Sequence, residues 1–247
     1  MVKKSYTVLT VVSTPIGNLE DITLRSISAF READYIAVED IRHACILLQK
    51  LGFSKPLISF HKNNETSRTG EIVAHLKKGH RIALSCDAGM PAISDPGYRL
   101  ICACIRERLP FTVLPGPSAV LTALVGSGLP CREFYFAGFL PKKPGQRAKE
   151  LQQAAIRPWT SVYFESPYRL VKSLATLVEI RPLIFVCVAR EISKKFEEYR
   201  RGIVSEVLAY FSAHPPRGEI VLLIHGTEER STIGSGETPS GNISPFI

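Results

Sequence analysis

Short apolar runs alternate with helix-length stretches along almost the whole chain. The expected strands lie at residues 7–13, 35–39, 57–60, 81–86, 111–114, 134–138, 160–164, 183–189, 195–202 and 219–225. The expected helices lie at residues 23–33, 42–51, 65–78, 97–108, 119–125, 145–155, 168–178 and 205–214. Strands separated by such helices are typical of a parallel sheet covered on both faces. Most of the strands are continuously apolar, as burial on both faces requires. The alternation therefore predicts an α/β fold.

A break that contains glycine and proline, at residues 126–130, interrupts the alternation. We expect an N-terminal α/β domain at residues 1–129 and a C-terminal α/β domain at residues 130–226. Residues 227–247 are rich in Ser, Thr, Gly and Pro and lack periodicity, which predicts a disordered tail. No apolar run approaches the roughly 20 residues that span a bilayer, and no cleavable signal peptide is recognisable. We therefore expect a cytoplasmic protein.

The loops that follow several expected strands are rich in glycine, proline and serine. They lie at residues 13–19, 87–97, 115–118 and 165–169. Ligands of open parallel sheets bind beyond the carboxyl ends of strands, and glycine and proline fix a backbone close to a ligand. The chain has neither Gly-x-Gly-x-x-Gly nor the Walker pattern, which disfavours a dinucleotide or ATP site. From composition alone, ordinary strand-to-helix turns explain these loops equally well.

The net charge is +8, and most of the excess lies within residues 142–217. A basic balance favours a nucleic acid or another polyanion as partner. Two groups of basic residues stand out, although solvated surface charge explains them equally well: Lys142, Lys143, Arg147 and Lys149 form the first, and Lys194, Lys195, Arg200 and Arg201 the second.

The six cysteines show neither Cys-x-x-Cys nor a zinc-like spacing with histidine. We expect reduced, mostly buried thiols and no metal site. His43 and His61 are interpreted as structural histidines for the same reason.

A series of short motifs in fixed order is similar to the tetrapyrrole methylase (class III methyltransferase) superfamily. Within it, the chain most resembles the branch that methylates the 2′-oxygen of a cytidine ribose in small-subunit ribosomal RNA. The resemblance covers residues 7–226. It rests on Thr14-Pro15-Ile16-Gly17-Asn18-Leu19, Glu39-Asp40-x-Arg42-His43, Asp87-Ala88-Gly89-x-Pro91, Ser94-Asp95-Pro96-Gly97, Pro115-Gly116-Pro117-Ser118, Gly138-Phe139-Leu140-Pro141-x-Lys143, Glu165-Ser166-Pro167-x-Arg169 and Ala189-Arg190-Glu191.

The resemblance implies a two-domain fold with a mostly parallel N-terminal sheet, a mixed C-terminal sheet and S-adenosylmethionine in the cleft between the domains. It also implies a homodimer. The residues that it places at the cofactor are Pro15, Ile16, Asp87, Met90, Ser118, Ala119, Phe164, Ala189, Glu219 and Ile220. For Phe164 and Ala189, core packing remains an alternative, because apolar strand residues are usually buried.

Methylation of a ribose hydroxyl requires that its proton leave at some stage. The candidate acceptors are Glu39, Asp40, Asp95 and Glu165, of which we favour Asp95. Each can instead pair with a basic neighbour, and we expect an ion-pair network of Glu39, Asp40 and Arg42.

For the RNA we expect phosphate contacts from Lys142, Lys143, Arg147, Arg169 and Lys194. Tyr168 and Lys62 depart from the family, which commonly has His and an acidic residue at these positions. Two alternatives remain open: methylation of a tetrapyrrole or corrinoid precursor, and a non-enzymatic RNA-binding factor for ribosome assembly.

Overall fold

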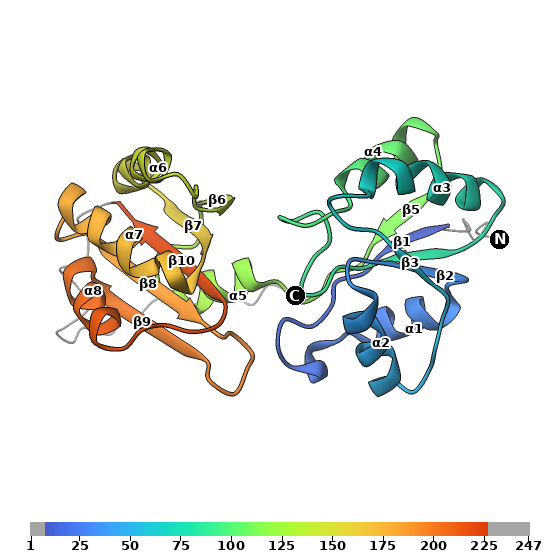
Figure 1. Cartoon of the computed structure of the whole chain (residues 1–247), viewed down its shortest axis with the longest axis horizontal. Helices are drawn as coiled ribbons and strands as arrows, with labels where there is room; N and C mark the ends of the chain where they lie inside the picture. The colour runs from blue at the N-terminus through green and yellow to red at the C-terminus, as the bar shows by residue number, and fades with distance from the viewer. Residues whose placement is uncertain (1–7, 227–247) are drawn as a thin grey trace, which may run out of the picture.

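The computed structural model describes residues 8–226 and contains two separate five-stranded sheets (Figure 1). The predicted tail at residues 227–247 lies outside the described residues. The first sheet has the order β3-β2-β4-β1-β5, and all of its pairings are parallel. Its strands are β1 (Leu9–Val11), β2 (Tyr35–Val38), β3 (Leu57–Ser59), β4 (Ile82–Leu84) and β5 (Phe111–Val113).

Two helices cover each face of this parallel sheet. One face packs against α1 (Leu24–Glu32) and α2 (Ile41–Lys50), and the other against α3 (Glu65–Lys77) and α4 (Tyr98–Arg106). On β2, Ile36 and Val38 face the first pair of helices and Ala37 the second, as the two-residue period of a strand dictates. We call these sheet and helix elements the N-terminal lobe.

The second sheet is mixed and has the order β6-β7-β10-β8-β9. Its β6–β7 pairing is parallel, and its other pairings are antiparallel. The strands are β6 (Phe134–Phe139), β7 (Thr160–Glu165), β8 (Phe185–Arg190), β9 (Glu198–Ile203) and β10 (Ile220–His225). The helices α6 (Pro144–Ile156), α7 (Pro167–Ile180) and α8 (Val204–Ala213) cover one face. These elements form the C-terminal lobe, and the predicted combination of a parallel and a mixed sheet is confirmed.

Helix α5 (Ala119–Ser127) covers the other face of the second sheet. Its Val120, Ala123 and Leu124 pack against Val162 and Cys187. The predicted division at residue 129 therefore falls after a helix that belongs to the C-terminal lobe by its packing. The glycine-containing break marks the end of α5. Gly128, the C-cap residue of α5, has a left-handed φ of 68°, which ends the helix. We propose that the division lies at residues 114–118, where the chain passes from one sheet to the other.

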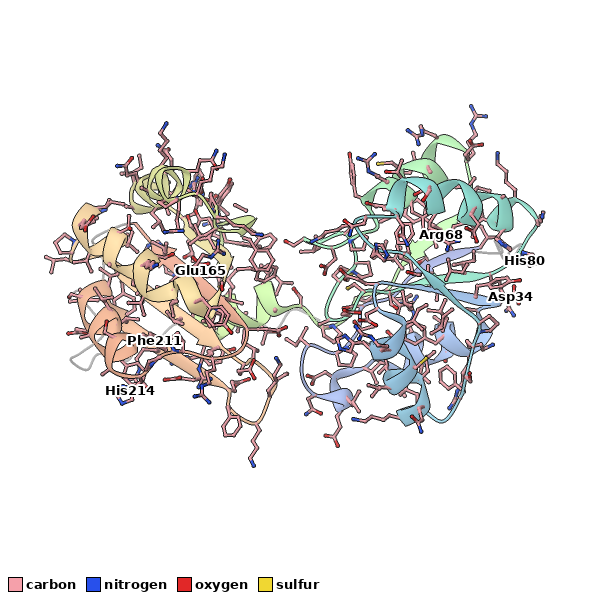
Figure 2. All side chains as sticks on the ribbon, in the orientation of Figure 1. Asp34, Arg68, His80, Glu165, Phe211 and His214 are labelled. Carbon is pink, nitrogen blue, oxygen red and sulfur yellow. The ribbon has the colours of Figure 1, made fainter. Side chains whose placement is uncertain are left out.

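The parallel sheet points the carboxyl ends of its strands toward the C-terminal lobe. Asp34 directly precedes β2 and His80 lies two residues before β4, and both are at the end of the N-terminal lobe that is far from the other lobe (Figure 2). The loops after β1, β2 and β4 consequently emerge where the two lobes face each other. No helix within residues 8–226 is long and apolar enough to cross a membrane.

Two of the contacts between the lobes occur where glycine allows close approach. A Cβ atom on Gly17 would lie 2.9 Å from the carbonyl oxygen of Ile192, and one on Gly138 would lie 3.0 Å from Ser94 Oγ. Beside the first point, Ser193 Oγ donates a hydrogen bond of 2.6 Å to Asp21 Oδ2. These contacts bring the loops of the N-terminal lobe against β6 and the loop after β8.

Candidate active site

A cavity of about 520 Å³ lies between the lobes, which is within the usual range for a small-molecule site. Eight of the ten predicted cofactor residues line this cavity: Ile16, Asp87, Met90, Ser118, Ala119, Phe164, Glu219 and Ile220. They come from loops and strands that lie far apart in the sequence. The lobe arrangement therefore brings together most of the residues that the motifs singled out.

The two exceptions are Pro15 and Ala189. Pro15 precedes a lining residue but does not line the cavity. Ala189 is fully buried near the end of β8, opposite Val221 of β10, and packs in the core beneath α5. Core packing, the alternative left open for Phe164 and Ala189, is what the structure shows for Ala189. Phe164 packs against the same core but also lines the cavity.

The loop that follows β4 forms much of the N-terminal wall of the cavity. Gly89, Ala92, Ser94 and Gly97 all have positive φ, at 77°, 70°, 67° and 140°. For Ala92 and Ser94 this conformation is strained, at a cost on the order of 1 kcal/mol each. A hydrogen bond of 3.1 Å from Ala92 N to the carbonyl oxygen of Pro96 holds the turn closed. Such strain is typical of loops shaped for a ligand.

Asp87 begins this loop and is tied to the start of α2. Its Oδ1 accepts a hydrogen bond of 3.1 Å from Asp40 N, and its Oδ2 lies 3.2 Å from Nδ1 of His43. His43 thus positions a cavity carboxylate, in agreement with its interpretation as a structural histidine. The fixed Asp87 can accept hydrogen bonds from the hydroxyls of a nucleoside.

Glu39 and Asp95 are the other carboxylates of the N-terminal wall. Burial raises the pKa of Glu39, and the charges of Asp95 and Asp87 raise it further, while Lys62 opposes them. Burial likewise raises the pKa of Asp95, again against Lys62. Carboxyl groups with raised pKa values are suited to proton transfer, because a base works best when its pKa approaches the operating pH.

The remaining candidate acceptors are engaged in structural pairs. Asp40 is the N-cap of α2, and its two carboxylate oxygens accept from the Arg42 guanidinium at 3.1 and 2.6 Å. Hydrogen bonds from Arg42 hold the pKa of Asp40 well below its usual range. The expected network is thus confirmed for Asp40 and Arg42, whereas Glu39 faces the cavity instead. Arg99 pairs with Glu65 and not with Asp95.

Glu165, labelled in Figure 2, ends β7 with a fully buried side chain. One carboxylate oxygen lies 2.7 Å from Arg169 Nη2, and the other accepts a hydrogen bond of 2.6 Å from Ser173 Oγ. Both oxygens of the Glu165 carboxylate therefore already have a hydrogen-bonding or charged partner. Arg169, predicted to contact RNA, instead neutralises a buried carboxylate of the cavity wall.

Two further basic side chains predicted to bind RNA instead interact with other groups of the protein. Lys194 Nζ lies 2.9 Å from the carboxylates of both Glu191 and Glu219. Arg147 is only 6% exposed and donates a hydrogen bond of 3.3 Å to the carbonyl oxygen of Lys142. The prediction of a surface phosphate contact is wrong for Arg147, because α6 turns this side chain toward the core.

The second basic group is also largely committed. The Arg200 guanidinium lies 3.5 Å from the ring centroid of Tyr210, and Arg201 Nε donates a hydrogen bond of 3.1 Å to the carbonyl oxygen of Ser127 at the end of α5. By contrast, Lys142 and Lys143 are exposed on the loop between β6 and α6. Only part of the positive charge near the cavity therefore remains available to a polyanion.

Cys86, Cys104 and Cys187 are buried, Cys102 is partly buried, and Cys45 and Cys131 are exposed. The expectation of mostly buried thiols fails for the last two, because one lies on the outer face of α2 and the other follows the turn at Pro130. Within residues 8–226, no cluster of three His, Cys, Asp or Glu side chains is arranged to hold a metal ion.

The sequence motifs assign no role to Phe139. Phe139 lines the cavity and is 59% exposed. It follows Gly138, whose φ of 71° marks an irregularity in β6. A glycine next to an aromatic residue inside an expected strand is the sequence signal that indicates such a feature.

The chain is similar to known proteins in sequence and in fold. Residues 8–208 match the family model described as Tetrapyrrole (Corrin/Porphyrin) Methylases. Ribosomal RNA small subunit methyltransferase I of Thermotoga maritima is 44% identical over 89% of this chain and 99% of its own. The protein of the same name from Hydrogenobaculum sp. is 43% identical over 87% and 94%.

Solved structures of other methyltransferases share the fold at low sequence identity. Cobalt precorrin-4 methyltransferase superimposes with a TM-score of 0.67 at 15% identity, covering 91% of this chain and 97% of its own. Uroporphyrin-III-C-methyltransferase of Thermus thermophilus gives a TM-score of 0.61 at 20% identity, covering 88% and 94%. At this identity the likeness concerns the fold alone.

Proposed function

Because the chain belongs to the tetrapyrrole methylase family and is an S-adenosylmethionine-dependent methyltransferase, we propose that it methylates the ribose 2′-oxygen of a cytidine in small-subunit ribosomal RNA. The observation that carries this proposal is the 44% identity to a ribosomal RNA methyltransferase over 99% of that protein. Such a substrate places the enzyme in the cytoplasm.

The residues of the cavity fit S-adenosylmethionine. Ile16, Met90 and Phe164 supply apolar surface for an adenine, and Asp87 supplies a fixed acceptor for ribose hydroxyls. Ser118 caps the N-terminus of α5, where the helix dipole favours a carboxylate. When bound, the cofactor supplies a methyl group on a positively charged sulfur.

Asp95 is the residue that we propose as acceptor of the ribose hydroxyl proton. It lines the cavity, forms no ion pair with another residue of the described chain, and has a pKa raised by burial. Glu39 shares all three properties, and the mutual repulsion of the two charges disfavours ionisation of Asp95 and Glu39 together. Glu165 is excluded from this role by its pairing with Arg169.

The rim of the cavity supports an RNA substrate. Lys142 and Lys143 are exposed, close in sequence to the cavity residue Phe139, and each can contact a phosphate. Within residues 8–226, neither lysine has a carboxylate within ion-pair distance. A charged, sequence-blind rim of this kind positions a nucleic acid over the cavity.

We also propose that the enzyme is a homodimer. On α5, Leu121 and Val125 are 53% and 75% exposed and lie four residues apart, on one side of the helix. Sedimentation velocity should give the mass of a dimer, and Val125→Glu should shift it toward the monomer. A wild-type monomer at micromolar concentration would contradict the homodimer.

The function is tested by methyl transfer from labelled cofactor to isolated small ribosomal subunits and to their protein-free RNA, followed by mapping of the modified nucleotide. We expect incorporation at a cytidine ribose in one of the two substrates. A corrinoid precursor serves as the alternative acceptor. Incorporation into the corrinoid without incorporation into RNA would overturn the proposed substrate. Absence of cofactor binding by calorimetry would favour the non-enzymatic RNA-binding factor.

A further inference from the structure

We propose that Phe139 is the surface on which the base of the acceptor nucleotide stacks, an inference that rests on the proposed RNA substrate. Phe139 lines the central cavity and keeps 59% of its surface exposed. A large aromatic ring left open at a cavity is a ready platform for a second ring.

A β-bulge directs this ring toward the cavity. Phe136 pairs with Val162, but Phe139 pairs with Phe164, so β6 contains one residue more than β7 between these positions. Because side chains alternate between the faces of a strand, the extra residue moves Phe139 to the face that carries Phe136 and Phe164. The ring centroid of Phe164 lies 5.1 Å from that of Phe136 and 5.3 Å from that of Phe139.

Gly138 makes this arrangement possible and links it to the N-terminal wall. Its φ of 71° disfavours other residues, and a Cβ atom there would lie 3.0 Å from Ser94 Oγ. Phe139 follows Gly138 and Asp95 follows Ser94, so this contact holds the aromatic ring beside the loop that carries the proposed proton acceptor. A base on Phe139 would bring its own ribose toward Asp95.

The charges around the ring favour a nucleotide over a neutral apolar ligand. Lys142 and Lys143 are exposed on the loop that follows Phe139 and leads into α6. Single-stranded RNA is commonly bound by aromatic rings that stack on bases, next to basic side chains that contact the phosphates. The same ring could instead cover the adenine of the cofactor, and the experiment separates these two occupants.

The test compares Phe139→Ala with Phe139→Trp and with Phe196→Ala. Phe196 is a matched control, because it is 64% exposed next to Lys195 but does not line the cavity. We expect Phe139→Ala to weaken binding of small-subunit RNA about tenfold and to raise KM more than it lowers kcat. Phe139→Trp should retain affinity, and Phe196→Ala should resemble the wild type. Cofactor affinity and Tm should stay unchanged in all three variants.

Unchanged RNA affinity in Phe139→Ala would overturn the inference, and so would a loss of cofactor affinity with RNA affinity intact. A fluorescence measurement keeps the inference separate from the proposed function. With Trp159→Phe as background, Phe139→Trp places the chain's single tryptophan at the platform. We expect quenching by a single-stranded RNA oligonucleotide and none by an abasic oligonucleotide of the same length. Absence of RNA methylation by the wild type would contradict the proposed function, whereas equal quenching by both oligonucleotides would contradict stacking.

Discussion

The two walls of the cavity carry the same kinds of side chain in opposite states. On the N-terminal wall, Glu39 and Asp95 have raised pKa values and form no ion pair with another residue of the described chain. On the C-terminal wall, Glu165 and Glu219 are paired with Arg169 and Lys194. Pairing, rather than residue type, therefore decides which carboxylates remain available for chemistry.

The basic side chains near the cavity also divide into paired and unpaired ones. Arg169 and Lys194 neutralise carboxylates at the cavity, whereas Lys142 and Lys143 stand exposed at its rim. A paired cation next to a buried carboxylate stabilises the fold, and an exposed cation can bind a phosphate.

The largest expected effect separates the carboxylates of the two walls. Asp95→Asn should lower kcat for methyl transfer by about 10²- to 10⁴-fold, because the proton acceptor is lost, with cofactor affinity unchanged by calorimetry. The wild-type rate should fall as the pH falls through the raised pKa of Asp95, since only the ionised carboxylate accepts a proton. Glu165→Gln should keep its turnover per folded molecule. Wild-type turnover in Asp95→Asn would exclude Asp95 as the acceptor.

The next effect concerns stability. Arg169→Ala should lower the free energy of unfolding by roughly 3 kcal/mol, because it leaves the carboxylate of Glu165 buried without its cation. Urea denaturation measures this difference, and Lys143→Ala serves as the exposed control with no expected change. Adding Glu165→Gln to Arg169→Ala should recover part of the loss. Equal stability of both single variants would show that the pair is dispensable.

The third effect distinguishes the exposed cations from the paired ones through salt. The double variant Lys142→Ala/Lys143→Ala should reduce the slope of log affinity against log salt by about 1.4, since each lost phosphate contact removes about 0.7 for single-stranded RNA. Lys194→Ala should leave the slope unchanged, because its ammonium is held by Glu191 and Glu219. A reduced slope for Lys194→Ala alone would reverse the assignment.

The smallest expected effect is a gain in stability from removing the same carboxylate that catalysis needs. Burial raises the pKa of Asp95 above its value in the unfolded chain. The contribution of Asp95 to the free energy of unfolding is therefore fully present at acidic pH, where the carboxyl is protonated. It is lost as the pH rises through the folded pKa of Asp95. At neutral pH, Asp95→Asn should thus have a slightly higher Tm than the wild type, and the difference should shrink as the pH is lowered. A lower Tm at neutral pH would indicate that the ionised Asp95 is stabilised by a partner.

Sequence patterns predicted the elements well, because each depends on local signals. The alternation located every strand and α-helix of the described chain, although the short 3₁₀ helix Leu19–Asp21 was not expected. The predicted domain division differed from the packing because an apolar helix such as α5 carries no local sign of which sheet it covers. Its Gly128 ends the helix and was interpreted as the end of a domain.

The candidate site shows the same limit. The loop motifs located Asp87, Met90 and Asp95, since loops beyond the carboxyl ends of parallel strands converge by rule. Ala189 lies in the core, since a small apolar residue in a strand looks the same whether it faces a ligand or a helix. Phe139 was left without a role, because the bulge that redirects it depends on the register between β6 and β7.

By itself, the sequence determined the class of fold, the strand-end loops and the family, because periodicity and short motifs are properties of neighbouring residues. Only the tertiary structure decided which charges are free. Glu165 and Arg169 are neighbours along the chain, but Lys194 meets Glu219, and Glu39 meets Asp95, only after folding. The pKa of an ionisable group depends on its burial and on partners within a few ångströms, and those distances are set by how strands and loops far apart in the sequence pack within each lobe.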